Sequence, residues 1–140
     1  MELIEKVGLK GFEEFYPSEL SGGMRQRCSI ARAFNYVADL LLMDEPFKSL
    51  DYNLRISMIH YLLILWNSTK KTIVFVTHEI DEALLLGDRV ILLSDRPTKV
   101  DRETHLKKPK TERSLTDCDL VEERNAIIRV MQGYGAPDSE

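Results

Sequence analysis

Apolar positions recur along the chain at two spacings, and the alternation between them predicts an α/β fold. Spacings of three and four residues predict helices, whereas short apolar or β-branched runs predict strands. The expected helices span residues 2–7, 24–36, 54–66, 81–86 and 120–131, and the expected strands span residues 40–43, 72–77 and 89–93. Strands that alternate with helices favour a mostly parallel sheet flanked by helices.

The same pattern predicts which side chains are buried. The strand at residues 40–43 contains only apolar residues, so we expect it to be buried on both faces. Helical spacing selects one apolar face on each of three helices. These faces are Met24, Cys28 and Ala31 in the first, Leu54, Met58, Ile59, Leu62, Leu63 and Trp66 in the second, and Leu120, Val121, Ile127, Ile128 and Met131 in the third.

The residues after 94 differ in composition from those before. Ten of the eighteen residues at 96–113 are charged and two are prolines, which predicts an irregular or edge-strand segment. The helix at 120–131 follows, and residues 133–140 are expected to form a frayed tail. We therefore divide the chain into residues 1–94 and an appendix, residues 95–140, that carries a terminal helix.

Composition narrows the possible classes of protein. The chain has 140 residues, 44% of them hydrophobic and 30% charged, typical of one soluble domain or part of one. Its net charge of −4 gives no basic footprint for nucleic acid. No apolar run reaches the roughly 18 residues of a membrane span, so a membrane link is expected to run through a partner. Cys28 and Cys118 are expected to be free thiols, although a disulfide stays open.

Ser21, Gly22 and Gly23 precede the second helix directly. Glycines let the backbone approach an anion closely, and the first N–H groups of a helix point toward it. A serine at this position is equally suited to cap the helix. Taken alone, the motif supports an anion site and a simple turn with a cap about equally.

Two carboxylates, Asp44 and Glu45, end the apolar strand at residues 40–43. The carboxyl edge of strands is where open α/β sheets bind ligands. Asp44 suits Mg²⁺, held through water, and Glu45 suits the orientation or deprotonation of an attacking water. Acidic residues at strand ends are also common in solvated turns, and that alternative remains beside the functional one.

His78 directly follows the TIVFVT strand at residues 72–77. It is therefore expected at the same sheet edge as Asp44 and Glu45. A single histidine is more often a polar loop residue, and this is the interpretation given to His60 and His105.

The three motifs together carry more information than each alone. Gly23 and Asp44 are 21 positions apart, and Asp44 and His78 are 34 apart. In order and spacing, LSGGMRQR, LLLMDEP, the following Ser49-Leu50-Asp51 and VTHE resemble the ATP-binding-cassette (ABC) ATPases. The wording VGLKGFEEFYPSELSGGMRQR and VFVTHEIDEALLLGDRVILLS is most similar to importers of the nitrate, sulfonate and taurine type. The resemblance covers residues 2–100.

The resemblance implies the C-terminal part of a P-loop NTPase fold, with ATP and Mg²⁺ as cofactors. By position, Ser21, Gly22, Gly23 and Gln26 contact ATP held by a second subunit. Asp44 serves Mg²⁺, Glu45 is the general base, and His78 contacts the γ-phosphate. Asp51 reaches across a head-to-tail dimer interface. The aromatics at residues 12–16 are expected near the transmembrane partner, and a local aromatic cluster is the alternative.

The resemblance also implies a cellular setting. The expected partners are a second nucleotide-binding subunit, transmembrane permease subunits and, indirectly, a periplasmic or extracellular substrate-binding protein. No nucleic acid is expected. The chain is expected at the cytoplasmic face of the cell membrane as a peripheral subunit of a bacterial-type importer for a small anion or sulfonate-like solute.

Two features depart from the family. In the loop at residues 46–51, Lys48-Ser49 replaces the small residues that the family usually has after the proline, here Pro46. Lys48 is expected to point to solvent rather than to perturb this loop. No glycine in the sequence begins G-x-x-x-x-G-K-[ST], the P-loop that wraps phosphates. We therefore expect a truncated C-terminal part of the domain, inactive in ATP hydrolysis on its own.

Other interpretations stay open. The chain is alternatively a non-catalytic module that lends its signature motif in trans to a P-loop-competent partner, or a gene copy without function. A DNA-repair or chromosome-maintenance ATPase is a further alternative, but no heptad run beside the signature supports it.

Overall fold

The computed structural model describes residues 2–48 and 50–133. The chain divides into two compact units, Met1–Val76 and Thr77–Glu140. Ser49 and most of the tail predicted at 133–140 lie outside the described residues. The predicted division at residues 94 and 95 rests on the change in composition after residue 94 and stays a prediction.

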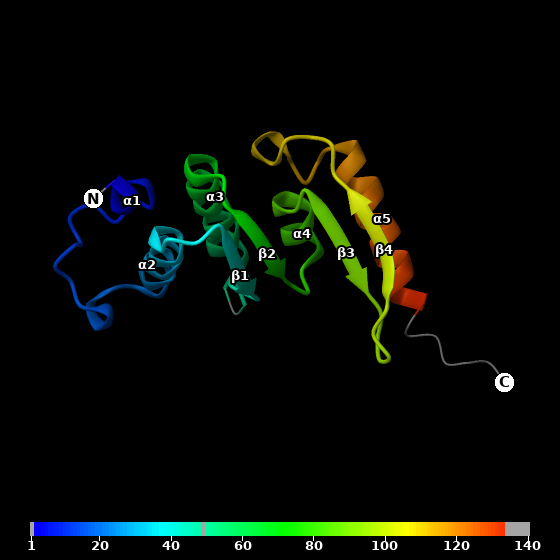
Figure 1. Ribbon diagram of the computed structural model, residues 1–140, viewed down its shortest axis with the longest axis horizontal. Coiled ribbons are helices and arrows are strands. Elements are labelled where there is room, and N and C mark those ends of the chain that lie inside the picture. The colour runs from blue at the N-terminus through cyan, green and yellow to red at the C-terminus, as the bar shows by residue number, and fades with distance from the viewer. Residues whose placement is uncertain (1, 49, 134–140) are drawn as a thin grey trace. The chain divides into compact units, whose positions relative to one another are not determined.

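The first unit is built around a parallel pair of strands, β1 (Leu40–Asp44) and β2 (Thr72–Val76). Leu40 pairs with Thr72 and Asp44 pairs with Val76, so both strands end at the same edge. The connection contains the 18-residue helix α3 (Tyr52–Thr69), as a parallel crossover requires (Figure 1). Asp44 is thereby placed at the carboxyl end of a βαβ unit.

Burial in this unit is one-sided at the sheet. Leu41 and Met43 of β1 are buried, while α3 buries Met58, Ile59, Leu62 and Leu65. The opposite face of the strands is exposed among the described residues, and Leu42 is 75% exposed. Leu40, Val74 and Val76 lie on that face and are also exposed. The expectation that residues 40–43 are buried on both faces is therefore wrong here, because only one face is covered by α3 and its neighbours.

Two further helices complete the first unit: α1 (Glu2–Lys6) and α2 (Gly22–Asn35), with a 3₁₀ turn at Pro17–Glu19 between them. Arg27 of α2 donates hydrogen bonds to the carbonyl of Val7 (3.1 Å) and to the hydroxyl of Tyr61 in α3 (3.2 Å). Gly8, at a φ of +66°, makes the turn after α1, where a Cβ would lie 3.1 Å from the Arg27 guanidinium. The cluster ties all three helices together.

The second unit contains an antiparallel hairpin, β3 (Arg89–Leu93) and β4 (Val100–His105), with α4 (Ile80–Leu86) before it. The edge strand expected within residues 96–113 is confirmed as β4. The α/β fold class is confirmed as well, but among the residues that the structure describes only β1 and β2 pair in parallel. The link between β3 and β4 is too short for a crossover, so the chain returns antiparallel and "mostly parallel" needs this correction.

Helix α5 (Cys118–Gly133) packs on this hairpin through one ionic network. Arg102 binds the Glu123 carboxylate with two hydrogen bonds, of 2.8 and 2.9 Å, and the Thr104 hydroxyl donates a third of 2.6 Å. The guanidinium and hydroxyl hold the pKa of Glu123 below its usual value, Arg102 being the main cause. Arg124 adds an ion pair to Asp81 of α4 at 2.9 Å.

A second arginine, Arg113, is buried within this unit and joins several of its segments. The Arg113 side chain is 0% exposed and follows a 3₁₀ turn at Lys110–Glu112. Its guanidinium donates to four backbone carbonyls, those of Leu84, Gly87, Leu106 and Lys108. Leu84 and Gly87 end α4, so Arg113 satisfies carbonyls that a helix C-terminus leaves without partners.

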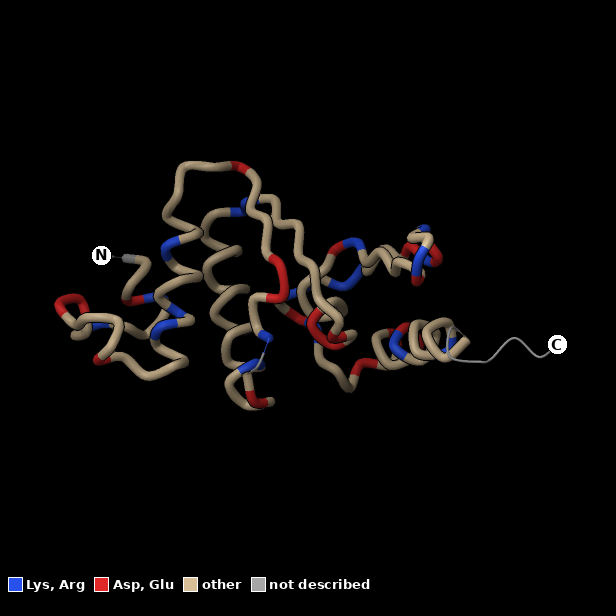
Figure 2. Tube along the Cα trace, turned by 90° about the horizontal axis from the view of Figure 1, so that it is seen from below, with Lys and Arg blue, Asp and Glu red and all other residues tan. Residues whose placement is uncertain are grey.

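Positions with Lys or Arg and positions with Asp or Glu both occur along the trace of each unit (Figure 2). Among the described residues, no helix is long and apolar enough to span a membrane. Cys28 and Cys118 are both free and exposed, in agreement with the expectation of free thiols.

Candidate functional site

The Ser21-Gly22-Gly23 turn starts helix α2 as a capped N-terminus. The backbone of Ser21 is extended, and its Oγ accepts a hydrogen bond of 3.2 Å from the N–H of Met24. The capping interpretation of this serine is therefore correct. It leaves room for an anion as well, because the space beside Gly22 is open. A Cβ there would meet its nearest neighbour, the Arg25 guanidinium, only at 3.9 Å.

Gly23 packs against helix α3. A Cβ at this position would lie 2.9 Å from Cδ1 of Leu54, in the first turn of α3, so the end of that leucine side chain would have to shift. The space beside Gly22 is more open, and Gly22 is therefore the better position at which to test a ligand.

Asp44 and Glu45 lie at the end of β1, as expected from the sequence. Asp44 is the last residue of the strand and is exposed. Glu45 turns the chain away with a φ of +43°, which is unusual for a residue with a side chain. Its N–H donates a 2.8 Å hydrogen bond to the carbonyl of Val76 at the end of β2. Backbone strain of this kind clusters at functional sites in proteins.

Lys48 lies three residues after Glu45 and pairs with it. The distance from Lys48 Nζ to Glu45 Oε2 is 2.5 Å, with the lysine 66% exposed and the glutamate 28%. The hydrogen bond to Glu45 raises the pKa of Lys48 above its ordinary value, and the charge of Asp44 adds to the effect. The expectation that Lys48 points to solvent is incomplete, since the turn brings its ammonium onto a carboxylate one residue from Asp44.

Gln26 connects the two motifs. Its side-chain amide donates a short hydrogen bond to the carbonyl of Pro46, the residue after Glu45. Phe47, fully buried, packs against Phe75 of β2 with ring centroids 5.7 Å apart. The signature helix and the turn that carries both carboxylates are thus joined within one unit.

Asp51 caps helix α3. Its Oδ1 accepts a 3.0 Å hydrogen bond from the N–H of Leu54, and its backbone angles nearly equal those of Ser21. The role of Asp51 at a dimer interface stays a prediction, while its capping role is established.

His78 belongs to the second unit. Its side chain is 59% exposed, and its Nε2 lies 3.7 Å from the Glu79 carboxylate. The preceding Thr77 accepts from the N–H of Glu79 (3.0 Å) and donates to Glu82 (2.6 Å) at the start of α4. The expected meeting of His78 with Asp44 and Glu45 therefore stays a prediction.

The described residues could bind Mg²⁺ together with a nucleotide, but not Mg²⁺ by themselves. They contain no group of three or more histidine, cysteine, aspartate or glutamate side chains that could hold a metal alone. Mg²⁺ bound with nucleotides takes one or two carboxylates and completes its shell with phosphate oxygens and water. Exposed Asp44 suits that role, and the open space beside Gly22 suits a phosphate.

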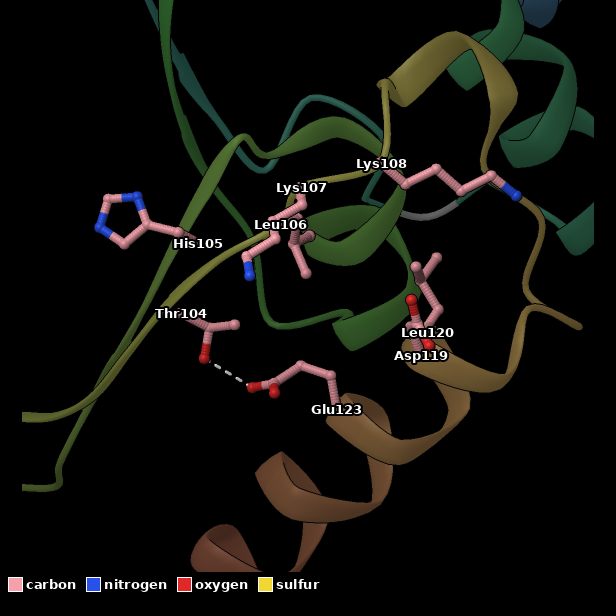
Figure 3. A pocket seen from close by; sticks show the side chains of 8 residues that line it. All are labelled: Thr104, His105, Leu106, Lys107, Lys108, Asp119, Leu120 and Glu123. Carbon is pink, nitrogen blue, oxygen red and sulfur yellow. Dashed lines mark hydrogen bonds between the residues drawn. The ribbon is translucent and has the colours of Figure 1, made fainter.

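A cavity of about 190 Å³ lies in the second unit, between the end of β4 and the first turns of α5 (Figure 3). Glu123 on its wall is engaged by Thr104 and Arg102, and Lys108 is paired with Asp117 at 2.7 Å. Lys108 and His105 extend away from the centre of the cavity in Figure 3. Glu123 and Lys108 thus serve the fold, and no function is assigned to the cavity.

The sequence does not predict two contacts of the site. The Gln26–Pro46 hydrogen bond joins residues twenty positions apart and has no local sequence signal. For the Lys48–Glu45 ion pair, the spacing of three residues is the available signal.

Comparison with known proteins finds relatives among the ABC transporters. Residues 1–48 match the family model for ABC transporters. An ABC transporter ATP-binding protein of Methanocaldococcus jannaschii is 41% identical over 94% of this chain and 49% of its own length. An aliphatic sulfonates import ATP-binding protein of Bacillus cereus is 44% identical over 96% of this chain and 53% of its own length.

Solved structures agree in fold. The ATP-binding cassette MJ0796, in a dimeric post-hydrolysis state with ADP and phosphate, superposes with a TM-score of 0.58 at 35% identity, over 76% of this chain and 45% of that one. A metal-chelate type ABC transporter in an inward-facing conformation gives 0.57 at 21% identity, over 90% and 47%, which bears on fold alone.

The fold is that of the ABC ATPases within the P-loop NTPases. In sequence, the chain is similar to ATP-binding proteins of ABC transporters. It spans about half the length of the relatives that it matches.

Proposed function

We propose that this chain supplies the signature motif and the hydrolytic residues of an ABC importer ATPase. The importer would couple ATP hydrolysis to the uptake of a small anion or sulfonate-like solute. The observation that carries the proposal is the Gln26–Pro46 hydrogen bond, which fixes the signature helix to the turn bearing Asp44 and Glu45. The sulfonate import protein among its relatives supports the class of solute.

Each residue has a proposed task. Bound Mg²⁺ would neutralise phosphate charge, the main electrostatic need of phosphoryl transfer. Asp44 would hold it through water, and Glu45 would orient the attacking water and accept its proton. His78 would contact the γ-phosphate. Ser21, Gly22, Gly23 and Gln26 would face ATP bound by a second subunit, and Asp51 would lie at the interface between the two.

The partners follow from the same proposal. They are a second nucleotide-binding subunit, permease subunits in the membrane and, indirectly, a substrate-binding protein. The chain would then work at the cytoplasmic face of the membrane. Exposed aromatics support a permease contact before the signature; they are Phe12, Phe15 and Tyr16. Phe12 and Phe15 also pack edge to face, with centroids 5.1 Å apart, so part of their order is local.

A polypeptide of residues 1–140 alone is proposed to be inactive. Its sequence has no G-x-x-x-x-G-K-[ST], so no loop of backbone N–H groups cradles the phosphates. Glu45 then has no positioned substrate to act upon.

The experiment is to combine this polypeptide with a family segment that carries the P-loop. ATP hydrolysis should be absent for each part and should emerge on mixing. Gly22→Ala is the sharpest probe of the signature, because the site accommodates a Cβ and the fold should persist. Hydrolysis that does not emerge, with both parts folded and associated, would contradict the proposal.

The alternative is a module that lends its signature to a P-loop-competent subunit without hydrolysing ATP itself. The capped, open turn at Ser21 and Gly22 is the observation that favours it. The variant Glu45→Gln separates the two proposals when the chain is mixed with an intact ABC subunit. If the chain only lends its signature, ATP hydrolysis by the mixture depends on Gly22 and is unchanged by Glu45→Gln. If the chain also hydrolyses ATP, hydrolysis depends on both residues.

A further inference from the structure

Three contacts shape the turn that follows β1 and contains Glu45 and Lys48. The N–H of Glu45 donates to the carbonyl of Val76, and the N–H of Lys48 donates to the carbonyl of Glu45 at 3.1 Å. The side chains of the same two residues then pair at 2.5 Å. Because the backbone already closes the turn, the ion pair is not needed to form it.

The ion pair engages the Glu45 carboxylate, which is the group that accepts the proton in the proposed function. In that step the water oxygen bonds to the γ-phosphorus, the bond to the bridging oxygen breaks, and ADP leaves. One proton of the water passes to the Glu45 carboxylate. A carboxylate that accepts a short, charge-assisted hydrogen bond from an ammonium is a weaker base, and it is directed toward that ammonium.

Asp44 strengthens the argument. It precedes Glu45, and its charge adds to that of Glu45 in attracting the Lys48 ammonium to this turn. An ammonium there competes with a cation that Asp44 would serve. The high exposure of Lys48 leaves its flexible stem free to swing away without repacking.

We propose that Lys48 is a positioning residue that acts as a brake on hydrolysis. It holds the Glu45 carboxylate in an ion pair that must open before Glu45 accepts a proton from water. The inference rests on the proposed function of Glu45 and adds a control that comes from this chain's own departure from its family.

The test compares steady-state ATP hydrolysis by Lys48 variants in the mixed assembly described above. Lys48→Gln should raise kcat by about three- to tenfold, within what base strength contributes to catalysis. The KM for ATP should change little. Lys48→Arg retains the pairing and should stay near the unaltered rate. Lys10→Gln is the matched control, because Lys10 also pairs with a glutamate, Glu5, at 2.7 Å in an exposed setting.

A second comparison links the effect to Glu45. In the Glu45→Gln background, Lys48→Gln should leave the residual rate unchanged, which a general structural effect would not do. Suppose that kcat of the Lys48→Gln assembly is equal to or lower than that of the unaltered assembly, while Glu45→Gln loses activity as expected. This result overturns the proposed role of Lys48 and leaves the proposed function of Glu45 intact. A Glu45→Gln assembly with full activity, or an assembly without hydrolysis, overturns the proposed function and the brake together.

Discussion

Gln26 donates a hydrogen bond from its side-chain amide to the backbone carbonyl of Pro46, and so joins helix α2 to the turn after β1. The contact spans twenty positions of sequence and connects the two halves of the candidate site. It places the N-terminal part of helix α2 and two carboxylates in a fixed relation within one compact unit. Both motifs of the proposed function depend on that relation.

Removal of this hydrogen bond should loosen the turn. Gln26→Ala is expected to destabilise the first unit by about 1 kcal/mol, the net value of a typical intramolecular hydrogen bond. Urea denaturation measures it. Gln132→Ala, at an exposed position in α5, is the matched control and should leave the denaturation midpoint unchanged. Equal midpoints for the two variants would show that the bond contributes nothing.

Arg113 should be the most sensitive position of the second unit. Arg113→Met removes the donor to four carbonyls while it preserves much of the apolar stem. Unsatisfied buried acceptors cost about 1–3 kcal/mol each, so a loss of at least about 2 kcal/mol is expected. Circular dichroism melting gives the comparison. Arg129→Met, an exposed position in α5, should behave like the unaltered chain, and a similar behaviour of Arg113→Met would refute the proposed closure.

Acid should weaken the packing of α5 on the hairpin. The pKa of Glu123 is lowered by Arg102 and Thr104, so its ionised form stabilises the folded state at neutral pH. Stability from this group is present above the unfolded-state pKa, about 4.3, and is lost as the pH falls through the lower folded-state pKa. Glu123→Gln should lower the melting temperature at pH 7 and flatten its decline between about pH 5 and 3. A decline of unchanged steepness would assign the acid sensitivity elsewhere, for example to Asp117, whose pKa Lys108 lowers.

The exposed apolar face of β1 and β2 should make the isolated polypeptide associate. Leu40, Leu42, Val74 and Val76 form a contiguous face without cover among the described residues, and such faces bind other apolar surface or aggregate. Light scattering should report particles larger than a monomer. Leu42→Lys should reduce them, whereas Val121→Lys on α5 should not. A monomeric wild-type polypeptide with a cooperative melt would contradict this expectation.

Sequence patterns predicted the elements better than their faces. The stripe on α3 was largely correct, since Met58, Ile59 and Leu62 are buried, because a long helix repeats its pattern enough to fix its face. On α2 the stripe expected from Met24 and Cys28 is wrong. Cys28 is exposed, and Ile30 and Phe34 are buried beside Ala31. Apolar residues occur on two sides of this helix, and spacing alone does not choose between them.

The candidate site shows the same limit. Local patterns predicted Ser21, Asp44 and Glu45 at element ends, because caps and strand ends are properties of a few neighbouring residues. The Gln26–Pro46 contact and the approach of Gly23 to Leu54 depend on how α2, β1 and α3 pack. Such long-range contacts leave no signal in a single sequence.

The most direct measurement of the central claim is phosphate release by the assembly of this chain with a P-loop-bearing segment, for the unaltered chain and for Glu45→Gln. If Glu45 is the base, the glutamine variant should lose at least about a hundredfold in kcat, the lower range of general-base catalysis, and should still bind ATP. Equal rates of phosphate release from the two assemblies would contradict the account.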